Sequence, residues 1–362
     1  MKFRLALAQI DPVLGNFQAN VAKHVALADR AAAAGAQVVV FPELALTGYS
    51  IKDMNWELAV NLRRDMRPIA PLIEKGKTIS ILTGGVEEGS SFGLYNAAFF
   101  FEGGEVRSVH RKTYPPTYGM FEENRYFSSG TDVRAVDSVY GRFGVLICED
   151  LWHLPLPYIL AQDGAGIILT LVASPTRISG KEERPGIATV NAENHRAYAR
   201  LLSVYVAFCN RVGFEDGVNF WGGSEIVGPD GSCIASAKLF EEDLIIADID
   251  ENESRRARRL SRHFLDDDPS PEAIRKQLDL LEHLARRRGS AVAIGHQGGE
   301  SPTGEGVSAA RLHRPGGGQK RGDEEPSSRT TETPRSVLGA GDSAQAAPAR
   351  RTAHRYERHR DR

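Results

Sequence analysis

Residues 144–152 read Gly-Val-Leu-Ile-Cys-Glu-Asp-Leu-Trp, an apolar run that stops at Cys148 and gives way to two acidic residues. A short apolar run with β-branched residues is typical of a buried strand. Cys148 stands where that strand ends, so its thiol is placed to project into a cleft. A cysteine considered alone is more often an inert buried thiol than a nucleophile, so its role depends on its neighbours.

Two other strand ends carry the groups that a reactive thiol needs. Glu43 follows the apolar run at 36–41, and Lys112 follows the strand predicted at 105–110. Because an ordinary thiol is mostly protonated at neutral pH, a base or a positive charge must activate it. Glu43 can act as the general base, and Lys112 can stabilise first the thiolate and then a tetrahedral oxyanion. These groups together predict covalent hydrolysis.

The backbone N–H of Glu149 is a natural second donor to an oxyanion. The residues of the trio also have simpler explanations. Glu43 could equally be an ordinary loop carboxylate, and Lys112 an ordinary surface lysine beside an arginine. The other two cysteines, Cys209 and Cys233, have no adjacent charged group and are expected to be structural.

The first 250 residues alternate between strand and helix patterns. Strands are predicted at 3–10, 36–41, 78–84, 95–101, 105–110, 141–148, 166–173, 204–210, 224–228, 233–237 and 244–249. Helices are predicted at 20–35, 56–75, 154–164 and 191–203. Gly103-Gly104 and Pro229-Asp230-Gly231 predict hairpins that interrupt this alternation. The fold class is therefore α/β, layered, with a mixed sheet.

The alternation of strands and helices ends near residue 250, and the composition changes after residue 289. A last helix is predicted at 270–289, where Pro271 suits the first position and Gly289 the end. Residues 290–362 are rich in Gly, Pro, Ser, Thr and Arg and offer little apolar surface to bury, so they are expected to be a disordered tail. Its arginine clusters could contact nucleic acid or acidic partners, but a solvated tail explains them better, because acidic residues are interspersed. The expected divisions are a catalytic domain at 1–250, a helical extension at 251–289 and this tail.

The overall composition is that of a soluble globular protein, with 41% apolar and 25% charged residues. A formal net charge of −2 gives no reason to expect a nucleic acid or a membrane surface as partner. No apolar stretch approaches the roughly 20 residues that a bilayer span requires. Three widely spaced cysteines do not make a disulfide framework, so a reducing, cytoplasmic location is expected.

The three motifs, in this order along the chain, resemble the nitrilase (carbon–nitrogen hydrolase) superfamily. The motifs are Phe41-Pro42-Glu43-Leu44, then Arg111-Lys112 before an aromatic residue, then Ile147-Cys148-Glu149-Asp150. The resemblance implies a four-layer α-β-β-α sandwich and a Glu43-Lys112-Cys148 triad. It also implies a homodimer or higher homo-oligomer paired through helices, and no metal or organic cofactor.

Longer motifs are similar to the glutaminase domain of glutamine-dependent NAD synthetases. They cover residues 41–49 (Phe-Pro-Glu-Leu-Ala-Leu-Thr-Gly-Tyr) and 114–123 (Tyr-Pro-Pro-Thr-Tyr-Gly-Met-Phe-Glu-Glu). The arginine that these domains carry past a pocket serine has no clean match here; Arg177 and Lys181 are both candidates. The sequence shows no ATP-pyrophosphatase domain after residue 250 and no phosphate-binding loop of the Ser-Gly-Gly-x-Asp-Ser type. We therefore expect that this chain does not make NAD alone.

The same resemblance suggests residues that contact a substrate. Tyr49 and Tyr118 match aromatic positions that line the amide pocket, and Glu123 matches an acidic residue near the triad, with Glu122 as a rival. Trp152 is expected to form a pocket wall. Ser174 matches a serine that helps to hold a glutamine-like substrate. Each of these residues also has an ordinary packing explanation.

Three hypotheses follow for the function. The first is a free-standing amidohydrolase that cleaves a small, glutamine-like carboxamide to acid and ammonia through a thioester on Cys148. The second is an ammonia-supplying glutaminase subunit of a separate synthetase. The third is a non-catalytic binding protein that keeps the fold. Amides are favoured over nitriles because the local motifs lean toward the amide-cleaving branches.

Overall fold

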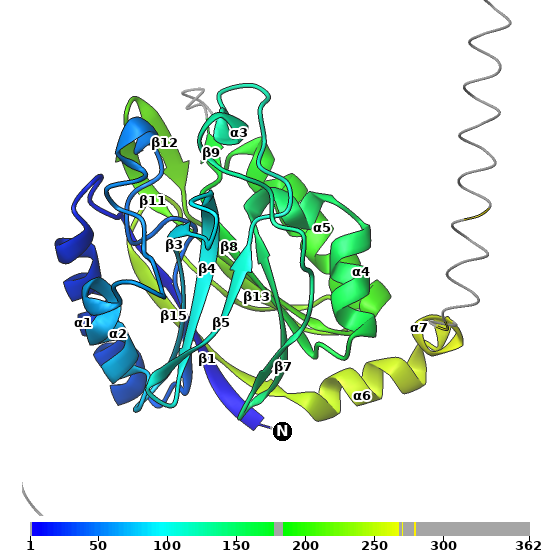
Figure 1. The fold of residues 1–362 in the computed structure, drawn as a ribbon. Helices are drawn as coiled ribbons and strands as arrows, with labels where there is room; N and C mark the ends of the chain where they lie inside the picture. The colour runs from blue at the N-terminus through cyan, green and yellow to red at the C-terminus, as the bar shows by residue number, and fades with distance from the viewer. Residues whose placement is uncertain (1, 177–183, 268–269, 271–278, 280–362) are drawn as a thin grey trace, which may run out of the picture. The chain divides into compact units, whose positions relative to one another are not determined.

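Two six-stranded sheets form the centre of the fold (Figure 1). The computed structural model describes residues 2–176, 184–267, 270 and 279. In the first sheet β1, β2 and β3 run parallel and the other neighbours are antiparallel. Its strands, in spatial order, are β15 (Asp243–Asp250), β1 (Lys2–Gln9), β2 (Val38–Val40), β3 (Ser80–Glu88), β4 (Leu94–Glu102) and β5 (Glu105–Arg111).

The second sheet is mixed as well, with β7, β8 and β10 parallel. Its strands, in spatial order, are β14 (Cys233–Ser236), β13 (Glu225–Val227), β10 (Tyr205–Asn210), β8 (Ile167–Val172), β7 (Gly141–Ile147) and β6 (Val136–Ser138). A small antiparallel sheet joins β11 (Val212–Glu215), β12 (Val218–Trp221) and β9 (Pro175–Thr176). The sequence did not predict β6 or this small sheet.

Helices cover the outer face of each sheet. The first sheet is covered by α1 (Phe17–Ala33) and α2 (Ala70–Lys75), the second by α4 (Pro155–Gln162) and α5 (Gly186–Leu202) (Figure 1). One apolar cluster fills each helix–sheet interface, and a third lies between the sheets. This is the α-β-β-α sandwich expected from the sequence, and the α/β fold class with mixed sheets is confirmed.

The central strands are apolar on both faces because both faces are covered. All three residues of β2 and all six of β8 are buried. Parallel strands covered on both sides typically show such continuous apolar runs instead of an alternation. The ends of these strands are consequently the first places where polar side chains can enter the fold.

The prediction of a helix at 56–75 is wrong over most of that range. Only α2 is helical there, preceded by turns and by the short 3₁₀ segment η2 (Arg67–Ile69). The side chains of Asn61 and Asp65 accept hydrogen bonds from backbone N–H groups two or three residues ahead, which competes with the helix. Pro68 removes a further backbone donor.

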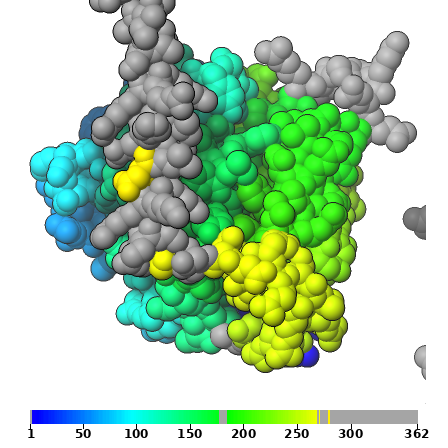
Figure 2. Space-filling view, turned by 90° about the vertical axis from the view of Figure 1, so that its right-hand side faces the viewer, coloured from blue at the N-terminus to red at the C-terminus, as the bar shows by residue number. Residues whose placement is uncertain are grey.

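Two helices follow β15, α6 (Glu251–Leu260) and α7 (His263–Asp266). Both lie in the helical extension expected at 251–289, although the sequence analysis placed no individual helix before residue 270. Phe264 is buried in the cluster of α4 and α5, and His263 Nε2 lies 2.9 Å from the carbonyl oxygen of Leu201; Figure 2 shows α6 and α7 beside that face. The helix predicted at 270–289, apart from Ser270 and Asp279, and the tail at 290–362 lie outside the described residues. In the described part of the chain no helix is long and apolar enough to cross a membrane.

Candidate active site

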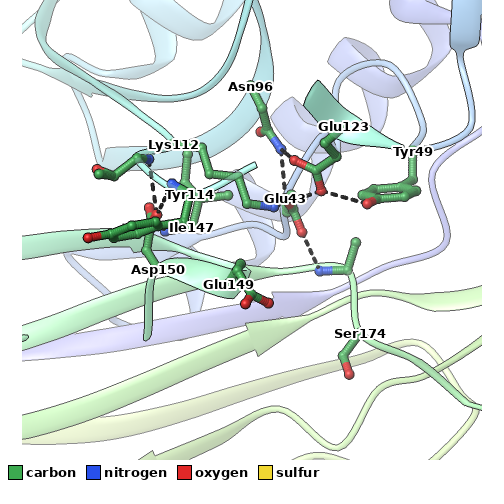
Figure 3. Close-up of polar contacts among 12 residues, drawn as sticks. Glu43, Tyr49, Asn96, Lys112, Tyr114, Glu123, Ile147, Glu149, Asp150 and Ser174 are labelled. Carbon is green, nitrogen blue, oxygen red and sulfur yellow. Dashed lines mark hydrogen bonds and ion pairs between the residues drawn. The ribbon is translucent and has the colours of Figure 1, made fainter. Parts of the chain in front are cut away.

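The three strand ends singled out by the sequence meet at one edge of the sandwich. Glu43 lies in the loop after β2, Lys112 directly follows β5, and Cys148 directly follows β7. The first two come from one sheet and the third from the other, so the site spans the gap between the sheets. Figure 3 shows Glu43 and Lys112 pointing toward each other.

The Glu43 carboxylate is held from three directions and is 1% exposed. Its Oε1 accepts hydrogen bonds from Lys112 Nζ at 2.7 Å and from Asn96 Nδ2 at 2.7 Å. Its Oε2 accepts one from the backbone N–H of Ala173 at 2.9 Å. These contacts fix the carboxylate in one orientation, as a general base requires.

Lys112 is as deeply buried as Glu43 and contacts a second carboxylate. Its Nζ lies 2.7 Å from Glu43 Oε1 and 2.7 Å from Glu123 Oε1. Burial alone would lower the pKa of Lys112, but Glu123 and Glu43 outweigh it and raise that pKa well above its ordinary value. Lys112 is therefore an ammonium ion throughout the physiological range.

Glu123 is the first residue of the short helix α3 (Glu123–Tyr126). Together with Glu43 and Lys112 it forms a charged cluster. Its Oε1 also accepts a hydrogen bond from the Tyr49 hydroxyl at 2.6 Å. Burial raises the pKa of Glu123, Lys112 lowers it, and Glu43 raises it again, for a net increase. The structure thus brings Glu123 to Lys112, whereas its rival Glu122 precedes α3 without a capping hydrogen bond and lines a neighbouring cavity.

Cys148 begins the 3₁₀ segment η3 (Cys148–Trp152) with a backbone φ of 46°, in the left-handed region. Such a conformation is strained for a residue with a side chain and recurs at functional sites. Burial, followed by the charge of Glu43, raises the pKa of its thiol well above the ordinary value, and Lys112 opposes them. The resting thiol is therefore protonated and needs a base.

Other predicted substrate contacts lie around this centre. Tyr118 is 58% exposed and donates a hydrogen bond from its hydroxyl to Glu149 Oε2 at 2.7 Å. Ser174 is buried, and its Oγ accepts a hydrogen bond from Trp221 Nε1 at 3.0 Å. Trp152 ends η3 and is 42% exposed, so its role as a pocket wall stays a prediction. Arg177 and Lys181 lie outside the described residues.

Asn96 on β4 is a site residue that the sequence did not identify. Its Nδ2 donates to Glu43 Oε1 at 2.7 Å and to Glu123 Oε2 at 3.3 Å, so one amide joins both carboxylates. Its backbone carbonyl accepts the N–H of Lys112 at 2.8 Å. The sequence signal that could have identified it is a polar asparagine inside the otherwise apolar run 95–101. Such a residue is buried with the strand and therefore needs hydrogen-bond partners.

Replacing Asn96 by aspartate is expected to lower kcat by about 10²-fold, because a third negative charge would disfavour ionised Glu43. A carboxylate beside other carboxylates has a raised pKa, so the base stays protonated up to a higher pH. The acid limb of the kcat/KM profile should therefore move to higher pH. Asn191→Asp is the control, because buried Asn191 on α5 donates to the Ile187 carbonyl of its own helix and contacts none of the site carboxylates. An acid limb that stays in place in Asn96→Asp would contradict the assignment.

Gly84 on β3 allows the Glu43 loop to approach the sheet. A Cβ at this position would lie 2.4 Å from the backbone N of Leu44 and 2.8 Å from the Cα of Glu43. Backbone atoms this close cannot yield without moving the loop. The Gly84→Ala variant is therefore expected to lose stability by about 1–3 kcal/mol, and to lose activity beyond the effect of stability.

Thermal unfolding and amide turnover together test this expectation. Gly166→Ala is the matched control, because a Cβ at Gly166 meets no atom within 4 Å. An active Gly84→Ala protein with an unchanged Tm would show that the loop is free to shift.

The described residues contain no group of three or more His, Cys, Asp and Glu side chains that could hold a metal ion. A cavity of about 270 Å³ is lined by Tyr49, Glu123, Tyr126 and Met120 among others. Lys52 and Asp216, which form an ion pair at 2.6 Å, also line it.

Comparisons with known proteins agree with this geometry. Residues 4–259 match the family model for carbon-nitrogen hydrolase. The glutamine-dependent NAD(+) synthetase of Thermotoga maritima is 33% identical over 259 residues, which are 70% of this chain and 43% of that protein. A second model, divergent polysaccharide deacetylase, matches only residues 251–309, which lie largely outside the described part.

Solved structures give the same result. Glutamine-dependent NAD+ synthetase from Acinetobacter baumannii, in complex with ADP, aligns with a TM-score of 0.64 at 31% identity over 70% of this chain and 47% of that one. A carbon–nitrogen hydrolase from Helicobacter pylori aligns with a TM-score of 0.67 at 21% identity over 74% of this chain and 95% of that one. This chain spans less than half the length of the NAD synthetases it matches. These matches confirm the resemblance inferred from the motifs.

Proposed function

Because the chain belongs to the carbon–nitrogen hydrolase family, we propose that it is a thiol amidohydrolase. Its substrate would be a small primary carboxamide, and its products the acid and ammonia. The observation that carries this proposal is the buried contact between the Glu43 carboxylate and the Lys112 ammonium at 2.7 Å, beside a thiol whose pKa is raised by burial and by the charge of Glu43. A base, an oxyanion donor and a nucleophile are the three parts that acyl transfer requires.

In the first half of the reaction Glu43 takes the proton of the Cys148 thiol while the sulfur attacks the carbonyl carbon. The carbonyl oxygen becomes an oxyanion, which Lys112 Nζ and the backbone N–H of Glu149 stabilise. Glu43 then gives its proton to the nitrogen, the C–N bond breaks, and ammonia leaves. What remains is an S-acyl thioester on Cys148.

In the second half a water molecule replaces ammonia. Glu43 takes a proton from the water as the oxygen attacks the thioester, and the same donors hold the second oxyanion. The C–S bond then breaks, the proton returns to sulfur, and the acid is released. Glu43 alternates between base and acid, so its fixed orientation serves both halves.

A glutamine-like substrate is supported by the names of the relatives, which are glutamine-dependent enzymes. Glu149 and Tyr118, joined at 2.7 Å near the exposed side of the site, offer acceptor groups for an amine or an amide. A panel of amides, with ammonia release measured and Cys148 searched for an acyl adduct by mass spectrometry, tests the proposal. The absence of both turnover and adduct across the panel would favour a non-catalytic binding protein.

A second candidate is a glutaminase that supplies ammonia to a separate synthetase, such as an NAD synthetase. Its support is that the glutamine-dependent NAD(+) synthetases of Thermotoga maritima and Acinetobacter baylyi are each more than twice as long as the segment they share with this chain. Co-purification with an ATP-dependent partner, and glutaminase turnover that rises in its presence, would favour this candidate. Turnover that is indifferent to any partner would favour the free-standing enzyme.

The assembly and location are also part of the proposal. Exposed apolar side chains on α4 and α5, namely Ile159, Val190 and Leu201, suit a homo-oligomer paired through helices. The three cysteines, none of them in a disulfide, suit a reducing cytoplasm. Light scattering of the full chain tests the first point, because a monomer at all concentrations would contradict it.

A further inference from the structure

The carboxylate of Asp150 is fully buried and accepts from donors on both sheets. Its Oδ1 accepts hydrogen bonds from the backbone N–H groups of Thr113 at 3.0 Å and Tyr114 at 2.9 Å. Its Oδ2 accepts one from the backbone N–H of Ile147 at 3.2 Å and lies 3.3 Å from His110 Nε2. Figure 3 shows these strand ends converging on Asp150.

These donors are the immediate neighbours of two triad residues. Thr113 and Tyr114 follow Lys112, and Ile147 precedes Cys148. The bond to Ile147 alone would cap the 3₁₀ segment η3. The bonds to Thr113 and Tyr114 reach farther, because these residues lie 37 and 36 positions away, in the loop that follows β5 of the other sheet.

We propose that Asp150 is a positioning residue, whose carboxylate fixes the Cys148 thiol relative to the Lys112 ammonium across the gap between the sheets. This inference rests on the proposed amidohydrolase function. Cys148 has a strained, left-handed backbone, and such a conformation persists only where several contacts determine it. Asp150 supplies contacts on the residue before Cys148 and, at the same time, on the loop after Lys112.

The test is Asp150→Asn in the full chain. Asparagine keeps one acceptor oxygen and turns an NH₂ group toward backbone N–H donors, so contacts on one of the two sheets are lost. We expect kcat to fall by about 10²-fold, as for a misplacement of about 1 Å, while KM stays nearly constant. Alkylation of Cys148 by iodoacetamide, followed by peptide mass spectrometry, should slow by a similar factor, with exposed Cys233 as the internal reference.

Glu102→Gln is the matched control. Glu102 ends β4 and also joins the two sheets, because it accepts hydrogen bonds from Ser80 Oγ at 3.0 Å and Ser138 Oγ at 2.6 Å. It lies six residues along β4 from Asn96, roughly 20 Å from the site. This variant is expected to lower Tm and to leave kcat and Cys148 alkylation unchanged. Equal losses of activity in both variants, or an Asp150→Asn protein within about twofold of the parent, would overturn the proposal.

A second variant covers the case in which Asp150→Asn does not fold. His110→Asn removes one of the four donors and should slow Cys148 alkylation by about fivefold, the equivalent of one hydrogen bond. An unchanged rate would then overturn the proposal. Alkylation of Cys148 needs no substrate, so it tests the positioning role separately from the amidohydrolase function. If the parent protein hydrolyses no amide, the proposed function is wrong. If the rate of Cys148 alkylation still depends on Asp150, the positioning role is still supported.

Discussion

Replacing Cys148 by alanine is expected to lower kcat for amide hydrolysis by about 10⁴-fold or more, since no thioester can form. The rest of the charged cluster makes its contacts without the thiol, because Glu43, Lys112, Glu123 and Asn96 bind one another directly. Substrate binding should therefore persist while chemistry stops. Ammonia release and the loss of the acyl adduct in the mass spectrum measure this outcome.

The two other cysteines provide the controls for that experiment. Cys233 is exposed on β14, and Cys209 is buried where its thiol contacts the Val40 carbonyl oxygen at 3.3 Å. Cys233→Ala should keep full turnover, and Cys209→Ala should lose only stability, as for a small buried side chain. Full amidase activity in Cys148→Ala would refute the thioester mechanism.

The sequence predicted that Glu43, Lys112 and Cys148 each follow a strand. The mainly apolar runs at 36–41 and 141–148 favoured strands covered on both faces, and the polar residues that follow such strands are expected at a sheet edge. Glu43, Lys112 and Cys148 did fall at strand ends that meet. The fold class followed from the same alternation of strands, helices and hairpins.

The supporting contacts could not be predicted in the same way. Asn96 reaches Glu43 across 53 residues, and Asp150 reaches Thr113 across 37. Such pairs depend on the register of strands and on how the two sheets face each other, which periodicity does not encode. The helix expected at 56–75 failed for a local reason, because side chains of Asn61 and Asp65 bind the backbone that a helix would need.

Replacing Glu43 by glutamine is expected to lower kcat by about 10³-fold or more, because Glu43 moves a proton in both halves of the reaction. Glutamine can still accept from Lys112 and Asn96 through its oxygen. Its NH₂ group, however, would face the backbone N–H of Ala173, which now donates to Glu43 Oε2 at 2.9 Å. The loss therefore combines the missing base with a displaced side chain.

The pH profile of Glu43→Gln separates a lost base from a merely disturbed fold. In the parent protein the thiol proton passes to Glu43 inside the site, so the rate should change little between pH 7 and about 9. Without Glu43 the proton must leave to solvent, so the residual rate should rise about tenfold per pH unit until the thiol ionises. That ionisation comes at a lower pH than in the parent, because one charge that raises the Cys148 pKa is gone. Glu87→Gln, which breaks a half-buried ion pair between Glu87 on β3 and Arg111 at the end of β5, should keep the parent profile. A flat profile in Glu43→Gln would mean that another group takes the thiol proton.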